Sequence, residues 1–500
     1  IPGAVARAEV LRVLRPGGKA LLGGEVLTKP VPEGIDDWTH PYHGPDNNPQ
    51  STDQLARAPY LTQFLATPLW GCQPQVTVMA GGRAFRAFGH MAFRAYQNAA
   101  INTLYAMSSY NGAILWKRKL EPGFMIHRNA MIATPEVLYL ADDESCKLID
   151  AATGELKGRI APPPETAGGT VWKWMALEGG VLYALLGAGE VTADVRPGQG
   201  ARISGWPWSM WKGYDYKDPN TAWGFGRALL AIDPRSKKVL WSYRAEEVVD
   251  SRGVCMHSGR IFFYSRGKSL GCLNASDGRV RWQTSDAKLL EAIGPDTRAQ
   301  TAKFGFTTSV YAKCTADVLL FAGPQRPNLV AVSARDGKLL WQKKDGNFQL
   351  VLRPDALYAM GAGKSLKLDY RTGEVLGEIH GRQACTRATG SVDSIFVRGR
   401  GTRRVEVPSA NRSEHITPMR PSCHDGVIVS NGLLHWSPWI CGCSLCLFGN
   451  VCLGPAGDFD PQRAVDESAQ HEPGEGDWQR VKAPPAEGND WPAYLANSRR

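Results

Sequence analysis

Cysteine is the residue type in this chain with the widest choice of chemistry. There are 11 cysteines, and an odd count leaves at least one without a disulfide partner. Five lie between Cys423 and Cys452, where ICGCSLCLFGNVC gives the spacing C-x-C-x2-C-x5-C. Three interpretations stay open: disulfides, structural thiols, or a zinc or iron–sulfur site with tightly spaced ligands. The disulfide or metal candidates are Cys385, Cys423, Cys441, Cys443, Cys446 and Cys452.

Aromatic residues are concentrated in GWPWSMWKGYDYKDPNTAWGFG, within residues 187–226. Aromatic faces stack on sugars and cations, and loops often carry function. The segment therefore predicts either a platform for a glycan or another ligand, or a loop packed on its own aromatic side chains. The platform residues are Trp206, Trp208, Trp211, Tyr214 and Trp223.

Composition narrows the class of protein. Hydrophobic residues make up 43% and charged residues 21% of the 500 residues, which is typical of a globular protein. The net charge of +10 suits an anionic partner, but it is spread along the chain, so we expect no nucleic-acid ligand. No apolar run reaches the roughly 18 residues of a transmembrane helix. The chain has no Walker loop, HExxH motif or local signature of a catalytic triad.

One unit recurs along the chain: an apolar strand, a polar turn that ends in Gly, and a strand that often ends in Trp. LVAVSARDGKLLW (Leu329–Trp341) and LGCLNASDGRVRW (Leu270–Trp282) are two copies. Asp or Asn followed by Gly supplies the positive-φ turn of a tight hairpin, and Trp can fill the wedge between neighbouring units. The spacing of the copies is typical of a four-stranded propeller blade.

The repeat predicts an all-β propeller, with eight blades favoured over seven. The last two blades lack the Asp-Gly-Trp pattern and are placed on alternation alone. The predicted blades lie near residues 77–120, 128–160, 170–245, 251–284, 306–344, 348–379, 384–419 and 423–454.

The unit A-x-D-x-x-T-G-x-x-x-W resembles the repeat of pyrroloquinoline-quinone (PQQ)-like propellers. That family includes quinoprotein alcohol dehydrogenases and the non-catalytic propeller lipoprotein of outer-membrane protein assembly. The resemblance implies the fold over residues 77–454, but many members that share the repeat bind no quinone. The chain is also similar to large propeller proteins of planctomycete-type bacteria, in which a methyltransferase-like stretch precedes the propeller.

The amino-terminal stretch AEVLRVLRPGGKALLGG (Ala8–Gly24) is similar to a late helix–turn–strand of class I methyltransferases. The Gly-rich loop that holds S-adenosylmethionine in that fold is absent, and a chance amphipathic helix and strand is the other interpretation. The predicted divisions are a methyltransferase-like remnant (1–24), a linker leading into the propeller (25–76), the propeller (77–454), a polar linker rich in Pro and Glu (455–489), and the start of a further repeat region (490–500).

Residues just before each inner strand tend to line a propeller's central funnel. This rule selects a cationic set that would bind an anion, with solvated charges as the alternative. The resemblance further implies that basic and amide groups there could hold PQQ, activated by Ca²⁺, although no adjacent Cys-Cys pair and no recognisable set of calcium ligands is present. The funnel candidates are His127, Arg128, Asn129, Arg252, Lys303, Arg387 and His424.

The main functional prediction is a non-catalytic binding or scaffold propeller for an anionic small molecule, a glycan or a protein. We expect it in the periplasm or outside the cell, with a signal preceding Ile1, because disulfides would imply an oxidising compartment. A second hypothesis is a PQQ-dependent quinoprotein-type dehydrogenase of alcohols or sugars, in which Arg128, Arg252 and Arg387 clamp the quinone. A third is that the chain is a fragment of a methyltransferase–propeller fusion.

Overall fold

The computed structural model describes residues 6–92, 94–121, 130–163, 166, 168–189, 224–294, 309–323, 326–383, 386–409, 412–417, 419–438 and 449–459. The described residues up to Ala456 belong to one compact unit. Of the helices in these ranges, none combines the length and hydropathy that crossing a membrane requires.

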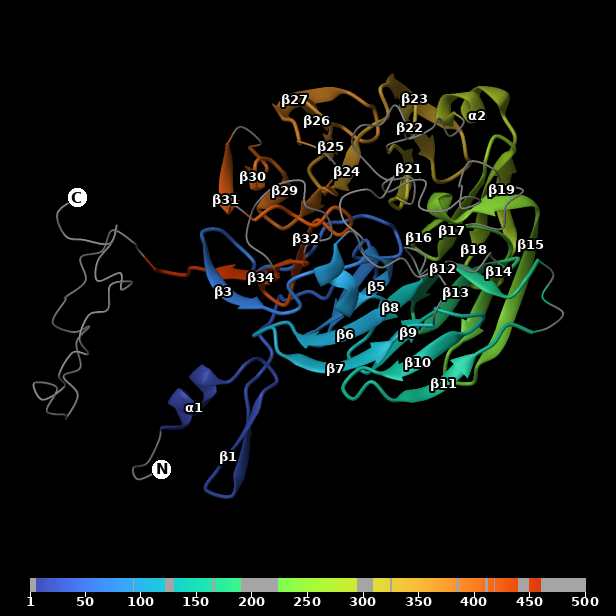
Figure 1. Cartoon of the computed structure of the whole chain (residues 1–500). Coiled ribbons are helices and arrows are strands. Elements are labelled where there is room, and N and C mark those ends of the chain that lie inside the picture. The colour runs from blue at the N-terminus through green and yellow to red at the C-terminus, as the bar shows by residue number, and fades with distance from the viewer. Residues whose placement is uncertain are drawn as a thin grey trace, which may run out of the picture. The chain divides into compact units, whose positions relative to one another are not determined.

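Eight four-stranded antiparallel sheets form a ring, and each sheet is one blade (Figure 1). The first strands of several neighbouring blades contact one another, so these strands line the channel. The inner strands, from blade 1 to blade 8, are β4 (Gln73–Ala80), β8 (Met131–Ala133), β12 (Val171–Glu178), β16 (Cys255–His257), β20 (Ala312–Cys314), β24 (Gln349–Leu352), β28 (Thr389–Gly390) and β32 (Val427–Ser430). The prediction of an eight-bladed propeller is confirmed.

The remaining strands lie progressively further from the channel. The second strands are β5 (Arg83–Met91), β9 (Val137–Leu140), β13 (Val181–Gly187), β17 (Arg260–Ser265), β21 (Val318–Phe321), β25 (Leu357–Met360), β29 (Ser394–Arg398) and β33 (Leu433–Trp436). The third strands are β6 (Thr103–Ser108), β10 (Cys146–Asp150), β14 (Phe225–Asp233), β18 (Ser269–Asn274), β22 (Asn328–Ser333), β26 (Lys364–Leu368), β30 (Thr402–Glu406) and β34 (Asn450–Pro455). The outer strands are β7 (Ile114–Lys119), β11 (Leu156–Ile160), β15 (Lys238–Asp250), β19 (Val280–Thr284), β23 (Leu339–Lys344), β27 (Val375–His380), β31 (Ser413–Thr417) and, in blade 8, β3 (Tyr60–Ala66).

Strand β3 closes the ring. It comes from the stretch predicted as a linker, yet it pairs antiparallel with β34 at the other end of the propeller, from Tyr60 opposite Pro455 to Ala66 opposite Asn450. Blade 8 is therefore built from both ends of the propeller sequence, and its outer strand ties the first blade to the last.

The repeated turn and Trp behave as the sequence predicts. Gly373 has φ +75°, and a Cβ built there would lie 2.6 Å from the ring of Trp341 in the preceding blade. The indole N–H of Trp341 donates to the carbonyl of Tyr370 in the same turn (3.1 Å). Trp282 and Gly337 repeat this packing one blade earlier. Each Trp thus fills the wedge between two blades while the next turn glycine leaves room for its ring.

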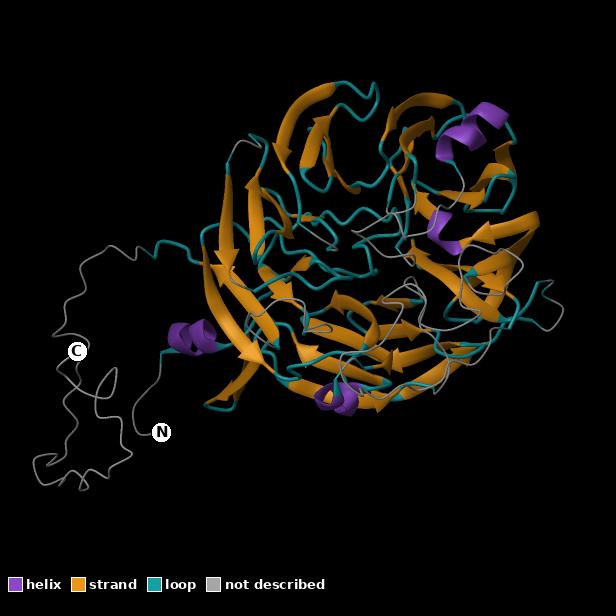
Figure 2. Ribbon diagram, turned by 45° about the horizontal axis from the view of Figure 1, so that its top comes forward, coloured by secondary structure: helices purple, strands orange, loops and turns teal. Residues whose placement is uncertain are grey.

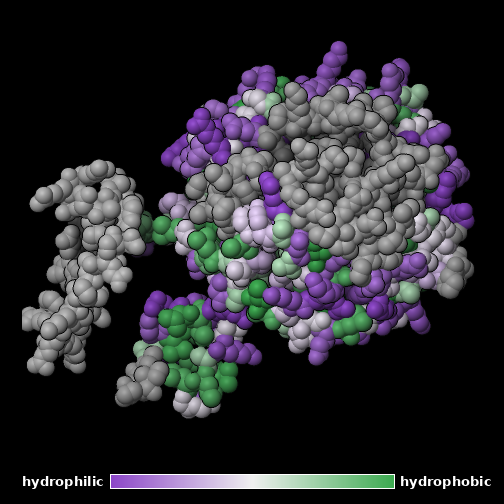
Figure 3. Space-filling view, in the orientation of Figure 1, coloured by the Kyte–Doolittle hydropathy of each residue, from purple (hydrophilic) through white to green (hydrophobic). Residues whose placement is uncertain are grey.

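The amino-terminal stretch forms helix α1 (Arg7–Val13) and a hairpin of β1 (Lys19–Leu22) and β2 (Glu25–Thr28). The predicted helix–turn–strand is present, but the strand is not buried, because Leu21 is 74% exposed. Apolar surface covers this element in Figure 3. The other helices are η1 (Ala95–Ala100), η2 (Ser251–Gly253) and α2 (Ala287–Ile293).

Candidate functional site

Residues 36–53, hereafter the axial segment, hydrogen-bond to every blade at or beside its inner strand. Figure 2 shows loop chain inside the ring of strands. The eight contacts, from blade 1 to blade 8, are Trp38 N–Met79 O (2.9 Å), Ala133 N–Thr39 O (2.9 Å), Leu177 N–His40 Nε2 (3.1 Å), Met256 N–Pro45 O (2.8 Å), Cys314 N–Asp46 O (3.2 Å), Leu352 N–Asn48 Oδ1 (3.0 Å), Gly390 N–Pro49 O (2.8 Å) and Asn431 N–Asp36 O (2.9 Å).

Most of these contacts lie near the carboxyl-terminal ends of the inner strands, as at Ala133, Cys314 and Leu352. The axial segment therefore closes the channel at that end, which we call the closed end. We call the opposite side of the ring the open face, because the bonds from the axial segment to the blades lie mostly at the closed end. Because strands alternate in direction within a blade, the connections from second to third strand and from outer strand to the next inner strand lie at the open face.

Short polar side chains and tight turns shape the axial segment. His43 and Asn47 have φ +75° and +60°, in the left-handed region that Asn tolerates well. Asp36 Oδ2 lies 2.7 Å from His43 Nε2 and accepts the backbone N–H of Thr52 (2.7 Å). Burial raises the pKa of Asp36, but the hydrogen bonds and charge of these partners outweigh it and lower that pKa to about 2.

Arg387, one of the predicted funnel residues, binds the axial segment. Its guanidinium donates to the carbonyl of Pro41 and lies 3.5 Å from the ring centroid of Tyr42. Lys313 lies 5.1 Å from the same ring and donates to the carbonyl of Asn47. Burial and the charge of Arg387 lower the pKa of Lys313 to about 7. Both cations therefore hold the segment that closes the channel.

Arg252, the second predicted arginine, lies in a buried cluster before the inner strand of blade 4. Its guanidinium forms two bonds to the Asp250 carboxylate, Nε–Oδ1 at 2.9 Å and Nη2–Oδ2 at 2.5 Å. Arg266 Nε lies 3.9 Å from the same carboxylate. The ring of Tyr311 lies 5.2 Å from the Arg252 guanidinium and 4.1 Å from that of Arg326. We call Arg252, Arg266 and Arg326, with Asp250 and Tyr311, the arginine cluster.

The structure brings Arg252 and Arg387 toward adjoining aromatic residues. Tyr311 contacts Arg252, and the neighbouring Val310 donates its backbone N–H to the hydroxyl of Tyr42 (3.1 Å), whose ring contacts Arg387. The two predicted arginines thus belong to one connected region of the channel wall, although each is engaged by groups of the protein.

The third described funnel candidate, His424, is buried in the turn before β32. The sulfur of its neighbour Cys423 accepts from Arg420 (3.4 Å), and Cys452 is a free thiol. The remaining predicted site residues lie outside the described residues: His127, Arg128, Asn129, Lys303, Trp206, Trp208, Trp211, Tyr214, Trp223, Cys385, Cys441, Cys443 and Cys446.

Sequence reasoning missed a buried polar network between blades 8 and 1. Asp425 accepts from the hydroxyls of Thr77 (2.7 Å) and Ser437 (3.1 Å), and Arg86 donates to the same two hydroxyls. Burial lowers the pKa of Arg86 to about 10. Nothing in the sequence RAFRAF distinguishes Arg86 from the neighbouring Arg83. Only the pairing of distant blades buries Arg86.

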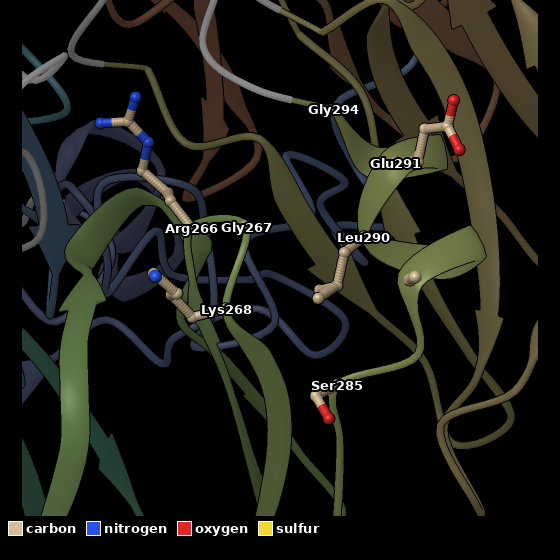
Figure 4. Close-up of a pocket in the computed structure, with 8 residues that line it drawn as sticks. Arg266, Gly267, Lys268, Ser285, Leu290, Glu291 and Gly294 are labelled. Carbon is tan, nitrogen blue, oxygen red and sulfur yellow. The ribbon is translucent and has the colours of Figure 1, made fainter.

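A cleft of about 640 Å³ lies at the open face, between the β17–β18 turn and α2. In Figure 4, Leu290 points from α2 toward this turn, which carries Arg266 and Lys268. Ser285 lies at another edge of the cleft and Gly294 at the end of α2. The cleft adjoins the arginine cluster, since Arg266 belongs to both and Arg326 donates to the carbonyl of Gly294 (2.9 Å).

A site for PQQ with Ca²⁺ in the channel would need oxygen ligands for the calcium ion and cations that face the quinone. Calcium takes six to eight oxygen ligands, usually including several carboxylates. Among the described residues, no group of three or more His, Cys, Asp or Glu side chains could hold a metal ion. Two of the cations expected to face a quinone are engaged, Arg252 by Asp250 and Arg387 by Pro41. The described side chains therefore do not by themselves form a calcium-quinone site.

Residues 225–434 match the family described as outer membrane protein assembly factor BamB, a PQQ repeat family. The matched range runs from the third strand of blade 3 into blade 8, through the copies in which the Gly and Trp packing repeats. The chain is an eight-bladed β-propeller with PQQ-like repeats. No curated protein matches the sequence of this PQQ-like propeller.

Solved structures with the same architecture have low sequence identity to the PQQ-like propeller. BamB from Moraxella catarrhalis is 13% identical, with a TM-score of 0.39 over 70% of this chain and 87% of that chain. Quinohemoprotein alcohol dehydrogenase ADHIIG from Pseudomonas putida HK5 is 10% identical, with a TM-score of 0.47 over 87% and 84%. The quinohemoprotein alcohol dehydrogenase from Comamonas testosteroni is 11% identical, with a TM-score of 0.37 over 74% and 76%. Likeness at this level carries no functional argument.

Proposed function

We propose that this PQQ-like propeller is a non-catalytic binding or scaffold protein that binds a ligand or a protein partner at its open face. The observation that carries the proposal is the axial segment, which closes one end of the channel and engages Arg387 and Lys313. Arg387 and Lys313 therefore serve the fold. The residues left to meet a partner lie at the open face.

We further propose that the protein acts outside the cytoplasm. The support is the matched family, which is described as an outer membrane protein assembly factor. The described cysteines add no support for an oxidising compartment, because Cys314, Cys452 and others in these ranges are free thiols.

The competing function is a PQQ-dependent dehydrogenase of alcohols or sugars, favoured by the two arginines that the structure places along one region of the channel wall. The test is a titration of the purified chain with PQQ and Ca²⁺, followed by a dye-reduction screen over alcohols and sugars. The binding proposal expects no PQQ-dependent turnover. Turnover that saturates with PQQ would overturn it.

Arg387→Ala separates the two functions with a second measurement. In the binding propeller this change removes the donor to the Pro41 carbonyl and the cation on Tyr42, so unfolding should become easier by about 2 kcal/mol. In a dehydrogenase it should also weaken quinone binding. Arg335→Ala, an exposed arginine in an outer turn of blade 5, is the matched control and should change neither.

A further inference from the structure

Two buried cysteines lie on the facing inner strands of blades 4 and 5. Cys255 belongs to β16 and Cys314 to β20, and these two strands contact each other. Both residues are free thiols, at 0% and 1% exposure. They belong to one hydrophobic cluster that fills the space between the two blades. The fold thus brings together two thiols that are about sixty residues apart in the sequence.

The alternation of side chains along each strand sends both thiols into this shared layer. Met256, the residue after Cys255, packs instead in the cluster between blades 3 and 4. Lys313, the residue before Cys314, turns to the axial segment and donates to the carbonyl of Asn47. Cys255 therefore points from blade 4 toward blade 5, and Cys314 points from blade 5 toward blade 4.

The two thiols are within hydrogen-bonding reach of each other. Burial, and next a hydrogen bond with the Cys255 thiol, raises the pKa of Cys314 well above its ordinary value. The backbone beside the pair is held from the channel, where the Asn47 amide bridges the carbonyls of Val254 (2.8 Å) and Ala312 (3.0 Å). Two cysteines can be joined without moving the backbone only where their side chains point at each other at short range. Cys255 and Cys314 have this arrangement.

Cys272, the third cysteine of the same cluster, is a poor partner for Cys255. Phe262 of β17 lies between them in blade 4, because it pairs with Cys255 on one side and with Cys272 on the other. Two strand spacings, about 10 Å, exceed the roughly 7 Å that a disulfide allows between Cα atoms. The geometry therefore favours Cys314 over Cys272 as the partner of Cys255.

We propose that Cys255 and Cys314 form a disulfide that joins blades 4 and 5 in an oxidising environment. One thiol, as its thiolate, attacks a small-molecule disulfide such as oxidised glutathione and releases one reduced thiol. The other cysteine then attacks the mixed disulfide and releases the second reduced thiol. The protein pair loses two electrons and two protons, which the oxidant takes up. This disulfide is independent of the proposed binding function.

The burial of the pair determines when it can react. The raised pKa keeps Cys314 protonated at neutral pH, and both thiols are shielded from reagents, so we expect oxidation only while the two blades are apart. Once formed, the bond would close a loop of about sixty residues and restrain the unfolded chain. It would hold the same two blades that Asn47 bridges.

The experiment equilibrates the full chain in glutathione buffers from fully reduced to fully oxidised, with urea just below the unfolding transition so that the blades open transiently. Free thiols are then blocked with iodoacetamide, and the chain is digested with trypsin without reduction for mass spectrometry. We expect a linked pair of peptides that carry Cys255 and Cys314, lighter by two hydrogen atoms than the two reduced peptides. The thermal midpoint should rise by several degrees on oxidation.

Cys272→Ala is the matched control, because it removes a buried thiol of the same cluster that lies outside the pair. It should keep the linked peptides and the rise in thermal midpoint, whereas Cys255→Ala and Cys314→Ala should each lose both. The peptide identification in the unmodified chain does not depend on the stability of these variants. Recovery of both cysteines in the alkylated form across all buffers, or linkage of Cys255 to another cysteine, would overturn the proposal.

Discussion

Asn47 joins the axial segment to two blades at once, so its replacement tests whether that segment holds the ring together. Its side-chain amide donates to the carbonyl of Val254 in blade 4 (2.8 Å) and to that of Ala312 in blade 5 (3.0 Å). The residue is 3% exposed and has φ +60°. Water cannot easily replace the amide at this depth.

Asn47→Ala removes both donors and leaves two buried carbonyls without them. Each lost bond costs roughly 1–2 kcal/mol in such a setting. Alanine in the left-handed region adds about 1 kcal/mol of backbone strain. We therefore expect the free energy of unfolding to fall by about 4 kcal/mol. Asn47→Gly loses the same hydrogen bonds without the strain, so its loss should be smaller by about 1 kcal/mol.

The assay is urea unfolding followed by tryptophan fluorescence, with equal slopes required across the variants. Asn111→Ala is the control, since Asn111 is exposed and its side chain accepts only the local N–H of Ala113 (3.0 Å) among its described contacts. That variant should lose less than about 1 kcal/mol. A loss in Asn47→Ala no larger than in Asn111→Ala would refute a structural role for the axial segment.

Three other predictions concern blade packing, pH and thiols. Gly373→Ala should lower the thermal midpoint by several degrees because its Cβ meets Trp341 at 2.6 Å, and an unchanged midpoint would contradict the wedge. Burial lowers the pKa of His40 to about 3 and its Nε2 accepts from Leu177, so acid favours the unfolded chain. His40 alone should lower the unfolding free energy by up to about 1.4 kcal/mol per pH unit below about pH 6.5, and His435, whose pKa burial also lowers to about 3, should add a similar fall. His40→Gln, assayed by urea titration, should therefore reduce the slope by about half. The seven described thiols are buried, so a thiol reagent should modify at most four cysteines of the native protein: Cys385, Cys441, Cys443 and Cys446. Modification of a fifth cysteine would contradict this prediction.

The repeating part of the fold could be predicted because its determinants are local. The turn at Asp369–Gly373 closes within one hairpin: the Asp369 carboxylate accepts the N–H of Arg371 (2.8 Å), and Gly373 takes the positive φ. The same few residues recur in other blades, so the spacing of the copies predicts the ring. Blades without the Asp-Gly-Trp pattern, such as β28 to β31, were found from strand alternation alone.

Strand β3 could not be assigned to a blade from sequence. Its sequence YLTQFLA shows no clear alternation, its partner β34 lies nearly four hundred residues later in the chain, and no local signal joins them. Arg387 presents the same difficulty. Its position just before an inner strand can be predicted from the sequence, but its contact with Pro41 depends on the axial segment. Its predicted ligand-binding role stays a prediction.

The role of the axial segment could not be predicted from the sequence. Its contacts use mainly backbone groups, and a stretch rich in Pro, Asp, Asn and His has the composition of an ordinary loop. Its position nevertheless decides where function can lie. The proposed binding function places a partner at the open face, where β13 ends at Gly187 and β14 begins at Phe225. The predicted aromatic platform is carried by the connection between those two residues, and Phe225 stacks on Arg266 of the cleft. The sequence that holds the predicted platform is therefore joined to blade 3 at the open face, the side on which the proposed binding function places the partner.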